Sequence, residues 1–267
     1  MPMAVQDLTR TEPATPSDSQ FTPVMESKPS TETLICCRLV AQLDKESLPE
    51  NLKLFIAGQQ RGFKVVLQVD LGQNRKCFGC IPDGTEDLIV AFSWFNPRNV
   101  VDLATLGMKM TKQRIQGNRN LTFSALAEEY YSAPGFAECV SKHSKVILTG
   151  FSMGGATANM MAFHMIEERD FKGNVTVVGL GCPRVGNAEF AQWFRKRLNP
   201  RSRNIIAAVP AEDGDGTCPL VFDPAGVGPK LADGFEPHPN LRVLYNGRVH
   251  EPSEAELGWM EAAERSR

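Results

Sequence analysis

The pattern of apolar and polar positions predicts alternating strands and helices in the second half of the chain. "KVILTG" (145–150) is a continuous apolar run rich in β-branched residues, which is typical of a central strand buried on both faces. The pattern continues with a helix at 153–171, a strand at 174–181, a helix at 187–198 with basic last turns, and a strand at 203–209. This β-α-β-α-β order favours an α/β fold with a mainly parallel central sheet flanked by helices.

The first half is less regular. Residues 33–43 form an apolar element that fits a helix or a strand, and residues 51–72 hold two apolar segments around "GQQRG". Residues 77–94 predict a hairpin with its turn at Asp83-Gly84 and a buried strand from Leu88 to Phe92. Residues 99–142 are mostly helical in pattern, with an interruption at Pro134-Gly135.

Composition limits the class of protein. Of 267 residues, 42% are hydrophobic, as in globular domains. Residues 1–30 are dominated by Pro, Ser, Thr and acidic residues, so we predict a disordered tail there and one domain over 31–267.

Charge and hydropathy argue against binding to nucleic acid, insertion in a membrane and secretion. The net charge of -2, from 29 basic and 31 acidic side chains, provides no electrostatic case for nucleic acid or for an anionic membrane surface. No apolar run approaches the roughly 20 residues that span a bilayer. The N-terminus has no apolar core of the kind that a secretory signal needs. We therefore expect a cytoplasmic protein that does not bind nucleic acid.

The cysteines do not suggest a disulfide framework, because there are seven of them and no secretion signal. Cys77 and Cys80 have C-x-x-C spacing, which also suits a redox pair or half of a zinc site. No second Cys/His pair is placed to complete four zinc ligands. The pair stands in a predicted strand that enters a turn, so we favour plain packing and keep a redox or zinc module as the weaker alternative.

Candidate chemistry centres on Ser152. Residues 150–154, "GFSMG", fit G-x-S-x-G between a buried strand and a helix that starts with small residues. A tight strand-to-helix turn leaves little room for β-carbons, and the glycines at 150, 154 and 155 give that room. The helix N-terminus would direct the N–H of Met153 to the negative charge that develops on an acyl carbonyl. The alternative is a serine that only belongs to a glycine-rich packing turn.

A serine nucleophile needs a base and an acid to orient that base, and the chain has four histidines. His143 precedes the central strand, roughly 20 Å from Ser152 at ~3.3 Å per residue. His164 is twelve positions along the helix, about 18 Å away at ~1.5 Å per residue. His238 and His250 remain, and both agree with the chain order Ser, Asp, His.

The candidate acids are Asp213 and Asp215, which follow the strand at 203–209. They would stand at the carboxyl edge of the sheet, where reacting groups gather in such folds. A solvated acidic turn explains "EDGDG" equally well. The residues alone leave this choice open.

Two longer segments carry a family resemblance. "VILTGFSMGGATANMMA" followed by "VVGLGCPRVGNAEFAQWF" resembles the class 3 lipase family, of the fungal triacylglycerol lipase type. The family's serine turn is followed about 30 residues later by a "G-x-P-R-V-G-N" turn and a helix with "F-A-x-W/F". The resemblance covers about residues 75–250 and is firm over 145–195. It implies an α/β-hydrolase fold and a Ser-Asp-His triad that hydrolyses carboxylic esters, commonly of acylglycerols or phospholipids, without metal or organic cofactor.

Carried over residue by residue, the resemblance implies that Ser152 is the nucleophile. Asp213 fits the family's acid better than Asp215, because Pro219 follows it six residues later. "FEPHPNLRVLYNG" resembles a family segment whose histidine is not catalytic, which assigns His238 to a structural part. His250 is then the expected base.

The chain also departs from the family pattern. Where the family has Arg-Gly-Thr or Arg-Gly-Ser to complete the oxyanion hole, this chain has Ser93 and Trp94. We expect Ser93, with Met153, to act as oxyanion donor, although losing one such donor typically lowers turnover by ~10²–10³. Phe151 stands where the family usually has histidine, a position outside the triad. A catalytically weak or inactive protein that binds a lipid or a protein partner is therefore the alternative function.

Residues 99–115 stand where family members carry a lid. Their mix of Leu, Met and Lys fits an amphipathic flap that opens at a lipid interface, and a helix packed on the core fits equally well. The expected partner is a lipid or other ester substrate, with transient contact at a membrane or lipid-droplet surface.

Overall fold

The computed structural model describes residues 29–43, 45–72, 75–93, 115–116, 119–182, 185–186, 188–210, 217–219, 241–245 and 248–250. The helices are α1 (Thr31–Val40), α3 (Leu121–Tyr131), α4 (Phe136–Ser141), α5 (Met153–Phe163), the π-helix η2 (His164–Glu168) and α6 (Ala188–Arg197). The strands are β1 (Asn51–Ile56), β2 (Gln59–Asp70), β3 (Lys76–Pro82), β4 (Leu88–Phe92), β5 (Ile115–Gln116), β6 (Arg119–Asn120), β7 (Lys145–Phe151), β8 (Asn174–Leu180), β9 (Arg203–Pro210), β10 (Thr217–Pro219), β11 (Leu241–Tyr245) and β12 (Arg248–His250).

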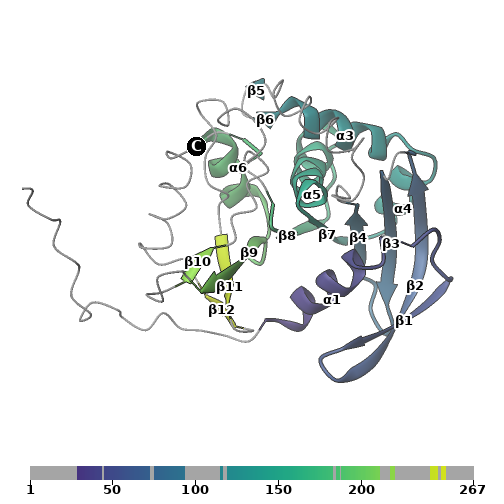
Figure 1. The fold of residues 1–267 in the computed structure, drawn as a ribbon. Coiled ribbons are helices and arrows are strands. Elements are labelled where there is room, and N and C mark those ends of the chain that lie inside the picture. The colour runs from purple at the N-terminus through teal and green to yellow at the C-terminus, as the bar shows by residue number, and fades with distance from the viewer. Residues whose placement is uncertain are drawn as a thin grey trace, which may run out of the picture.

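One sheet organises the described residues, with strands in the order β1-β2-β3-β4-β7-β8-β9-β11-β12 and with β10 paired to β9. The central strands β4, β7, β8, β9 and β11 are parallel to one another. The antiparallel pairs lie toward the two ends of the sheet. The predicted α/β-hydrolase fold, with a parallel central sheet flanked by helices, is confirmed (Figure 1).

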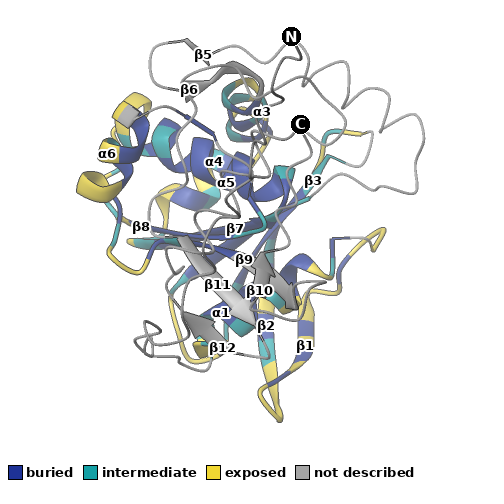
Figure 2. Cartoon of the chain, turned by 60° about the vertical axis from the view of Figure 1, so that its left-hand side comes forward, coloured by how far each residue is buried: buried dark blue, intermediate teal, exposed yellow. Residues whose placement is uncertain are grey.

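Two apolar clusters cover the two faces of this sheet. On one face, side chains of α3, α4, α5 and α6 pack on β4, β7 and β8. On the other face, α1 packs on residues from β1 to β4 and from β7 to β9. Figure 1 shows α1 on the side of the sheet opposite α5 and α6. Because both faces are covered, the interior of β7 is buried at every position (Figure 2), as its continuous apolar run predicts.

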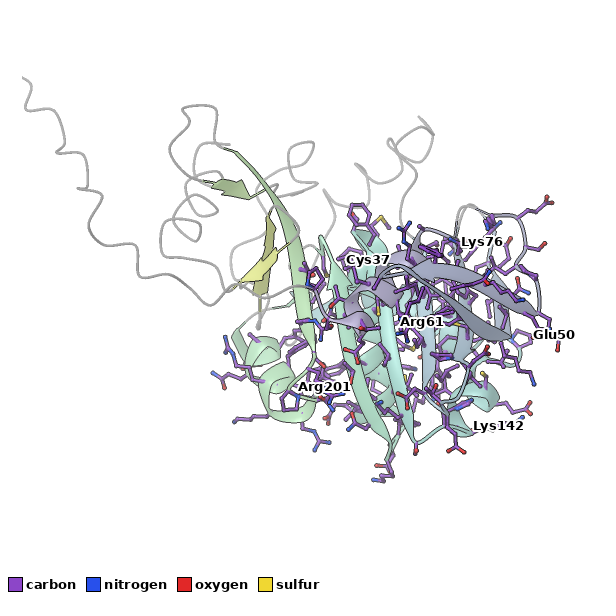
Figure 3. All side chains as sticks on the ribbon, turned by 90° about the horizontal axis from the view of Figure 1, so that it is seen from below. Cys37, Glu50, Arg61, Lys76, Lys142 and Arg201 are labelled. Carbon is purple, nitrogen blue, oxygen red and sulfur yellow. The ribbon has the colours of Figure 1, made fainter. Side chains whose placement is uncertain are left out.

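Turn chemistry sets the hairpins. Asp83 and Gly84 connect β3 to β4 as predicted, and Gly84 adopts a φ of 76° that suits glycine. Ala57 and Gly58, with φ of 49° and 81°, connect β1 to β2. Gln59 to Gly62 of "GQQRG" therefore belong to β2, and the two apolar segments of 51–72 are the strands of one hairpin. Charged side chains such as Glu50 and Lys142 stand at the periphery (Figure 3).

Most other predicted elements are confirmed within a few residues. The ambiguous segment 33–43 is largely helical as α1, with Ser30 as its N-cap. The interruption at Pro134-Gly135 separates α3 from α4. The predicted helix 153–171 ends earlier, because its last turn widens into the π-helix η2. No helix within the described ranges has the length and apolar character needed to cross a membrane. The predicted tail is outside the described residues up to position 28, as is the lid segment up to position 114.

Candidate active site

Ser152 occupies a strained turn between β7 and α5. Its backbone has φ of 50° and ψ of -119°, a combination that non-glycine residues adopt only where the surrounding structure enforces it. The N–H of Ser152 donates to the carbonyl of Leu180 at 2.8 Å, which fastens the turn to the end of β8. Strained backbone of this kind gathers at functional sites, and here it stands at the position predicted for the nucleophile.

The glycines around Ser152 are required by close backbone contacts. A β-carbon on Gly150 would lie 2.2 Å from the carbonyl carbon of Gly154. A β-carbon on Gly154 would lie 2.3 Å from the carbonyl oxygen of Phe92, and one on Gly155 would lie 2.9 Å from that of Gly150. Real β-carbons do not approach backbone atoms so closely. The three glycines therefore allow α5 to start directly against the ends of β7 and β4, as the sequence predicts.

The first turn of α5 has donors without helical acceptors. The N–H of Ala156 makes the first helical bond, to the carbonyl of Ser152 at 3.1 Å. The N–H groups of residues 153–155 precede that bond, and the Ser152 side chain caps none of them. This arrangement suits the predicted role of the Met153 N–H as an oxyanion donor. Ser152 itself has only 7% of its surface exposed.

Ser93 lies beside the same turn, because its carbonyl oxygen is 2.7 Å from the β-carbon position of Gly154. Its backbone N–H donates to the carbonyl of Lys76 at 2.8 Å, and its hydroxyl accepts from the N–H of Lys76, also at 2.8 Å. The Tyr130 hydroxyl lies 3.5 Å from the Ser93 hydroxyl. The N–H of Ser93 is thus used by the sheet, and its hydroxyl has partners in Lys76 and Tyr130. Trp94 lies outside the described residues.

The expected acid follows β9, and β9 ends at Pro210. Since β9 is parallel to β7 with one strand between them, both strands end at the same edge of the sheet. Asp213 and Asp215 come three and five residues after Pro210 and lie outside the described residues.

The late histidines are placed only in part. His238 lies outside the described residues, and of His250 the structure describes the backbone, at the end of β12. The pairings of β8, β9, β11 and β12 put His250 about level with residue 152 along the strands. Four strand spacings of about 4.8 Å separate β12 from β7, roughly 19 Å across the sheet. The described backbone therefore does not bring His250 beside Ser152.

The two other histidines have local partners. His143 Nδ1 lies 3.0 Å from the carbonyl oxygen of Glu86, at the amino edge of the sheet and opposite Ser152. His164 is 4% exposed and belongs to η2. Both stand where the sequence predicts, away from the serine.

His164 is held in a charged cluster that links α3 to η2. Its Nδ1 lies 2.5 Å from Glu168 Oε2, and its Nε2 lies 2.8 Å from Glu128 Oε2 and 3.0 Å from Arg169 Nε. Potential metal-ligand atoms of Glu128, His164 and Glu168 all lie within 4.8 Å of one another. Arg169 already supplies a positive charge, since its Nη2 lies 2.7 Å from Glu128 Oε1. We interpret the cluster as a tie between helices.

Cys77 and Cys80 lie on β3 with their side chains in different cores. Cys77 belongs to the cluster under α3 and α5, and Cys80 to the cluster under α1. Residues three apart on a strand face opposite sides of the sheet, so the two thiols cannot share a metal or form a disulfide with each other. Burial raises the pKa of both thiols. The predicted packing role of this C-x-x-C pair is confirmed.

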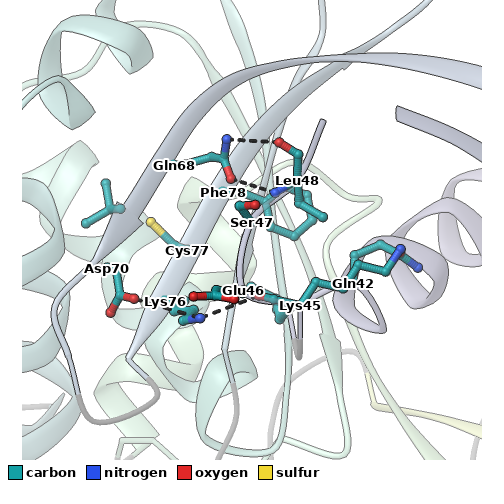
Figure 4. Close-up of a pocket in the computed structure, with 12 residues that line it drawn as sticks. Gln42, Lys45, Glu46, Ser47, Leu48, Gln68, Asp70, Lys76, Cys77 and Phe78 are labelled. Atoms are coloured by element: carbon teal, nitrogen blue, oxygen red, sulfur yellow. Dashed lines mark hydrogen bonds and ion pairs between the residues drawn. The ribbon is translucent and has the colours of Figure 1, made fainter. Parts of the chain in front are cut away.

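A small pocket of about 100 Å³ lies between the segment after α1 and strands β2 and β3 (Figure 4). Gln68 closes one side through hydrogen bonds to the N–H and carbonyl of Leu48, at 3.0 and 3.3 Å. Lys76 lies on the other side, with its Nζ 3.4 Å from the carbonyl oxygen of Lys45. A pocket this small does not fit an acyl chain, and Ser152 is not among its lining residues.

Comparison with known proteins agrees with this geometry. The family model for lipase (class 3) matches residues 98–213, which include the serine turn and the strand after it. This part of the chain is similar to the class 3 lipase family, as the sequence predicts. A comparison with curated protein sequences gives no match.

Solved structures similar to this chain include three fungal lipases. The lipase of Rhizopus microsporus var. chinensis is 17% identical, with a TM-score of 0.53 over 74% of this chain and 69% of that one. Lipase II from Rhizopus niveus is 18% identical, with a TM-score of 0.52 over 72% and 71%. The Rhizomucor miehei triacylglyceride lipase is 17% identical, with a TM-score of 0.51 over 72% and 74%. At these identities the likeness shows the fold.

The sequence patterns did not identify two residues that support the serine turn. Asn159 and Asn204 are 0% and 1% exposed, and both bond to the turn after β8. For Asn159, the sequence does carry one signal: it is the single amide side chain in the helix "MGGATANMMAF".

Proposed function

We propose that this chain is a serine hydrolase that cleaves carboxylic esters of lipids through an acyl-enzyme, with Ser152 as the nucleophile. The observation that carries the proposal is the strained backbone of Ser152 at the N-terminus of α5, with glycines that hold the turn open to the helix. Such a turn presents a hydroxyl beside unpaired N–H groups. A packing serine would not require φ of 50°.

The reaction follows from this arrangement. The Ser152 hydroxyl oxygen adds to the ester carbonyl while its proton passes to an imidazole. The tetrahedral oxyanion collapses, the bond to the alcohol breaks, and the imidazolium returns the proton to the leaving alcohol. Water then adds to the acyl-serine with the same imidazole as base, which releases the carboxylic acid and restores the hydroxyl. The Met153 N–H would stabilise the oxyanion in both steps.

For the base we propose His250, by chain order and by the family pattern, with Asp213 as the acid that orients it. His238 and Asp215 are the alternatives. Because β12 is four strands from β7, His250 can act as the base only if β12 moves toward the serine turn. For the second oxyanion donor we propose Ser93, because it lies beside the serine turn, with its carbonyl oxygen 2.7 Å from the β-carbon position of Gly154.

A fluorophosphonate probe tests the nucleophile directly, because it phosphonylates an activated serine whatever ester the enzyme prefers. We expect the purified protein to be labelled on Ser152 and the Ser152→Ala variant to be unlabelled. Ser141→Ala is the matched control, since the hydroxyl of Ser141 is exposed and bonds only locally, to the carbonyl of Glu138. It should label like the wild type.

A folded wild-type protein that never labels and hydrolyses no ester of any acyl length would contradict the proposal. If that protein still bound fatty acid, the alternative of an inactive lipid-binding member of the family would replace it. Labelling that persists in Ser152→Ala would move the nucleophile elsewhere.

A further inference from the structure

The turn after β8, at Leu180 to Cys182, contacts both the serine turn and β9. On one side the Ser152 N–H donates to the carbonyl of Leu180 at 2.8 Å. On the other side the N–H of Gly181 donates to the carbonyl of Ile205 at 2.7 Å. The position of the serine backbone therefore depends on how firmly residues 180–182 are held against β9.

Asn204, on β9, holds this turn with both ends of its amide. Its Oδ1 accepts from the N–H of Cys182 at 3.2 Å, and its Nδ2 donates to the carbonyl of Cys182 at 3.1 Å. Asn204 is 1% exposed. Its amide makes the hydrogen bonds that water would otherwise make to the N–H and carbonyl of Cys182. A β-carbon on Gly179 would lie 2.7 Å from Asn204 Oδ1. The glycine at this position of β8 therefore leaves room for the Asn204 amide.

Asn159, on α5, holds the same turn from the helix. Its Nδ2 donates to the carbonyl of Gly155 at 2.8 Å and to Cys182 Sγ at 3.4 Å. Asn159 is fully buried and is the one amide side chain in a helix made mostly of small and apolar residues. Cys182 thus stands between the two amides, and the β-carbon position of Gly155 lies 3.1 Å from Cys182 Cβ.

A buried amide must find its hydrogen bonds inside the protein, since an unpaired one is strongly unfavourable. Apolar side chains would fill the same space without that demand. Asn159 and Asn204 instead fix the turn through directional bonds, from the helix that starts at Ser152 and from the strand that leads to Asp213. A polar network of this kind specifies one arrangement of backbone more tightly than apolar contact does.

We infer that Asn204 and Asn159 are positioning residues for Ser152, which act through the 180–182 turn to set the serine relative to β9. This inference rests on the proposed function of Ser152. Neither residue touches the substrate. Their contribution is to the geometry of attack, where a displacement of about 1 Å can lower a rate by ~10².

The test separates the rate of serine reaction from the amount of folded protein. Asn204→Ala and Asn159→Leu are labelled with a fluorophosphonate at saturating probe, and both the rate constant at saturation and the final labelled fraction are measured. We expect the rate constant to fall roughly 10- to 100-fold in Asn204→Ala. It should fall less in Asn159→Leu, which keeps the Asn204 bonds, and the final fraction should match the wild type in both.

Asn199→Ala is the matched control. The Asn199 amide donates to another side chain, Asn174 Oδ1 at 3.0 Å, but Asn199 is only half-buried and lies near the amino edge of β8. Its rate constant should equal that of the wild type. A purely structural role for Asn204 predicts the opposite result from ours, a smaller labelled fraction with an unchanged rate constant, and that result would overturn the inference.

A second measurement keeps the inference testable if the wild type does not react. Cys182 is buried against both amides, so loosening of the turn should expose its thiol. Alkylation of Cys182 by iodoacetamide, followed by mass spectrometry, should be faster in Asn204→Ala than in the wild type and in Asn199→Ala. If wild type fails to label but this acceleration is seen, the proposed function fails and the turn-holding role stands. Equal alkylation in all three proteins would overturn the role itself.

Discussion

At the scale of single residues, the site depends on the absence of side chains as much as on the serine. Gly150, Gly154 and Gly155 each border a backbone atom at a distance that no β-carbon tolerates. They let the helix begin directly beside the strand ends, and this crowding enforces the positive φ of Ser152. The sequence motif G-x-S-x-G therefore reflects the limited space around Ser152.

Gly154→Ala tests this reading of the turn. The new β-carbon would stand 2.3 Å from the Phe92 carbonyl oxygen, and that backbone cannot move without disturbing β4. We expect the free energy of unfolding to fall by about 3 kcal/mol, at the upper end of the overpacking range, as measured by urea denaturation. Gly84→Ala is the control, because its β-carbon has open space and only the left-handed backbone of φ 76° opposes it, by about 1 kcal/mol. Equal losses in the two variants would refute the steric argument.

At the scale of elements, the cluster around His164 ties η2 to α3. Glu128 on α3 bonds Ser132, His164 and Arg169. Desolvation raises the pKa of Glu128, but the Ser132 hydrogen bond, then the charge of His164 and the Arg169 contacts, outweigh it and hold the pKa below the usual 4.5. Helix α5, which begins after Ser152, continues at its C-terminal end into η2 and so into this cluster.

A carboxyl whose pKa is lowered by folding stabilises the protein above its unfolded pKa. That contribution is lost as the pH falls through the lower, folded value. We therefore expect the Tm of the wild type to fall more steeply below pH 4.5 than that of Glu128→Gln, whose side chain does not titrate. Glu50→Gln, at an exposed position, should keep the wild-type slope. Because Glu128 is about half exposed, solvent screening keeps the difference small, and parallel curves for all three proteins would contradict it.

At the scale of the whole molecule, the sheet order decides which distant residues meet. Strands β7, β9 and β11 run in parallel, so the segments that follow them emerge at one edge. Ser152 follows β7 and the proposed acid follows β9. His250 comes after β11, on the hairpin strand β12.

The choice between the two late histidines is a prediction at this scale. We expect His250→Ala to lower the rate of fluorophosphonate labelling by at least ~10², because the serine loses its proposed general base, while His238→Ala retains most of the rate. Circular dichroism and Tm should show that both variants stay folded. The reverse pattern would assign the base to His238, and full labelling of both variants would remove histidine from the mechanism.

The sequence pattern predicted much of the fold, because strands, turns and close contacts leave signals in neighbouring residues. The apolar run at 145–150 required cover on two faces, Asp83-Gly84 required a tight turn, and the glycines beside Ser152 required close contact with a helix. The segment 33–43 stayed ambiguous as helix or strand, since a short apolar run satisfies both periodicities. The widening of α5 into η2 also escaped prediction, because it depends on the tie between His164 and residues of α3.

By itself, the amino-acid sequence determined the class of fold, the position of the serine turn and the packing role of the C-x-x-C pair, because each follows from spacing along a strand or across a turn. Only the tertiary structure decided that Asn159 and Asn204 converge on Cys182, residues that lie 23 and 22 positions from it. It alone placed β12 four strands from β7 and used the Ser93 N–H in the sheet. These features arise from contacts between segments far apart in the chain, and the spacing of residues along the chain does not predict such contacts.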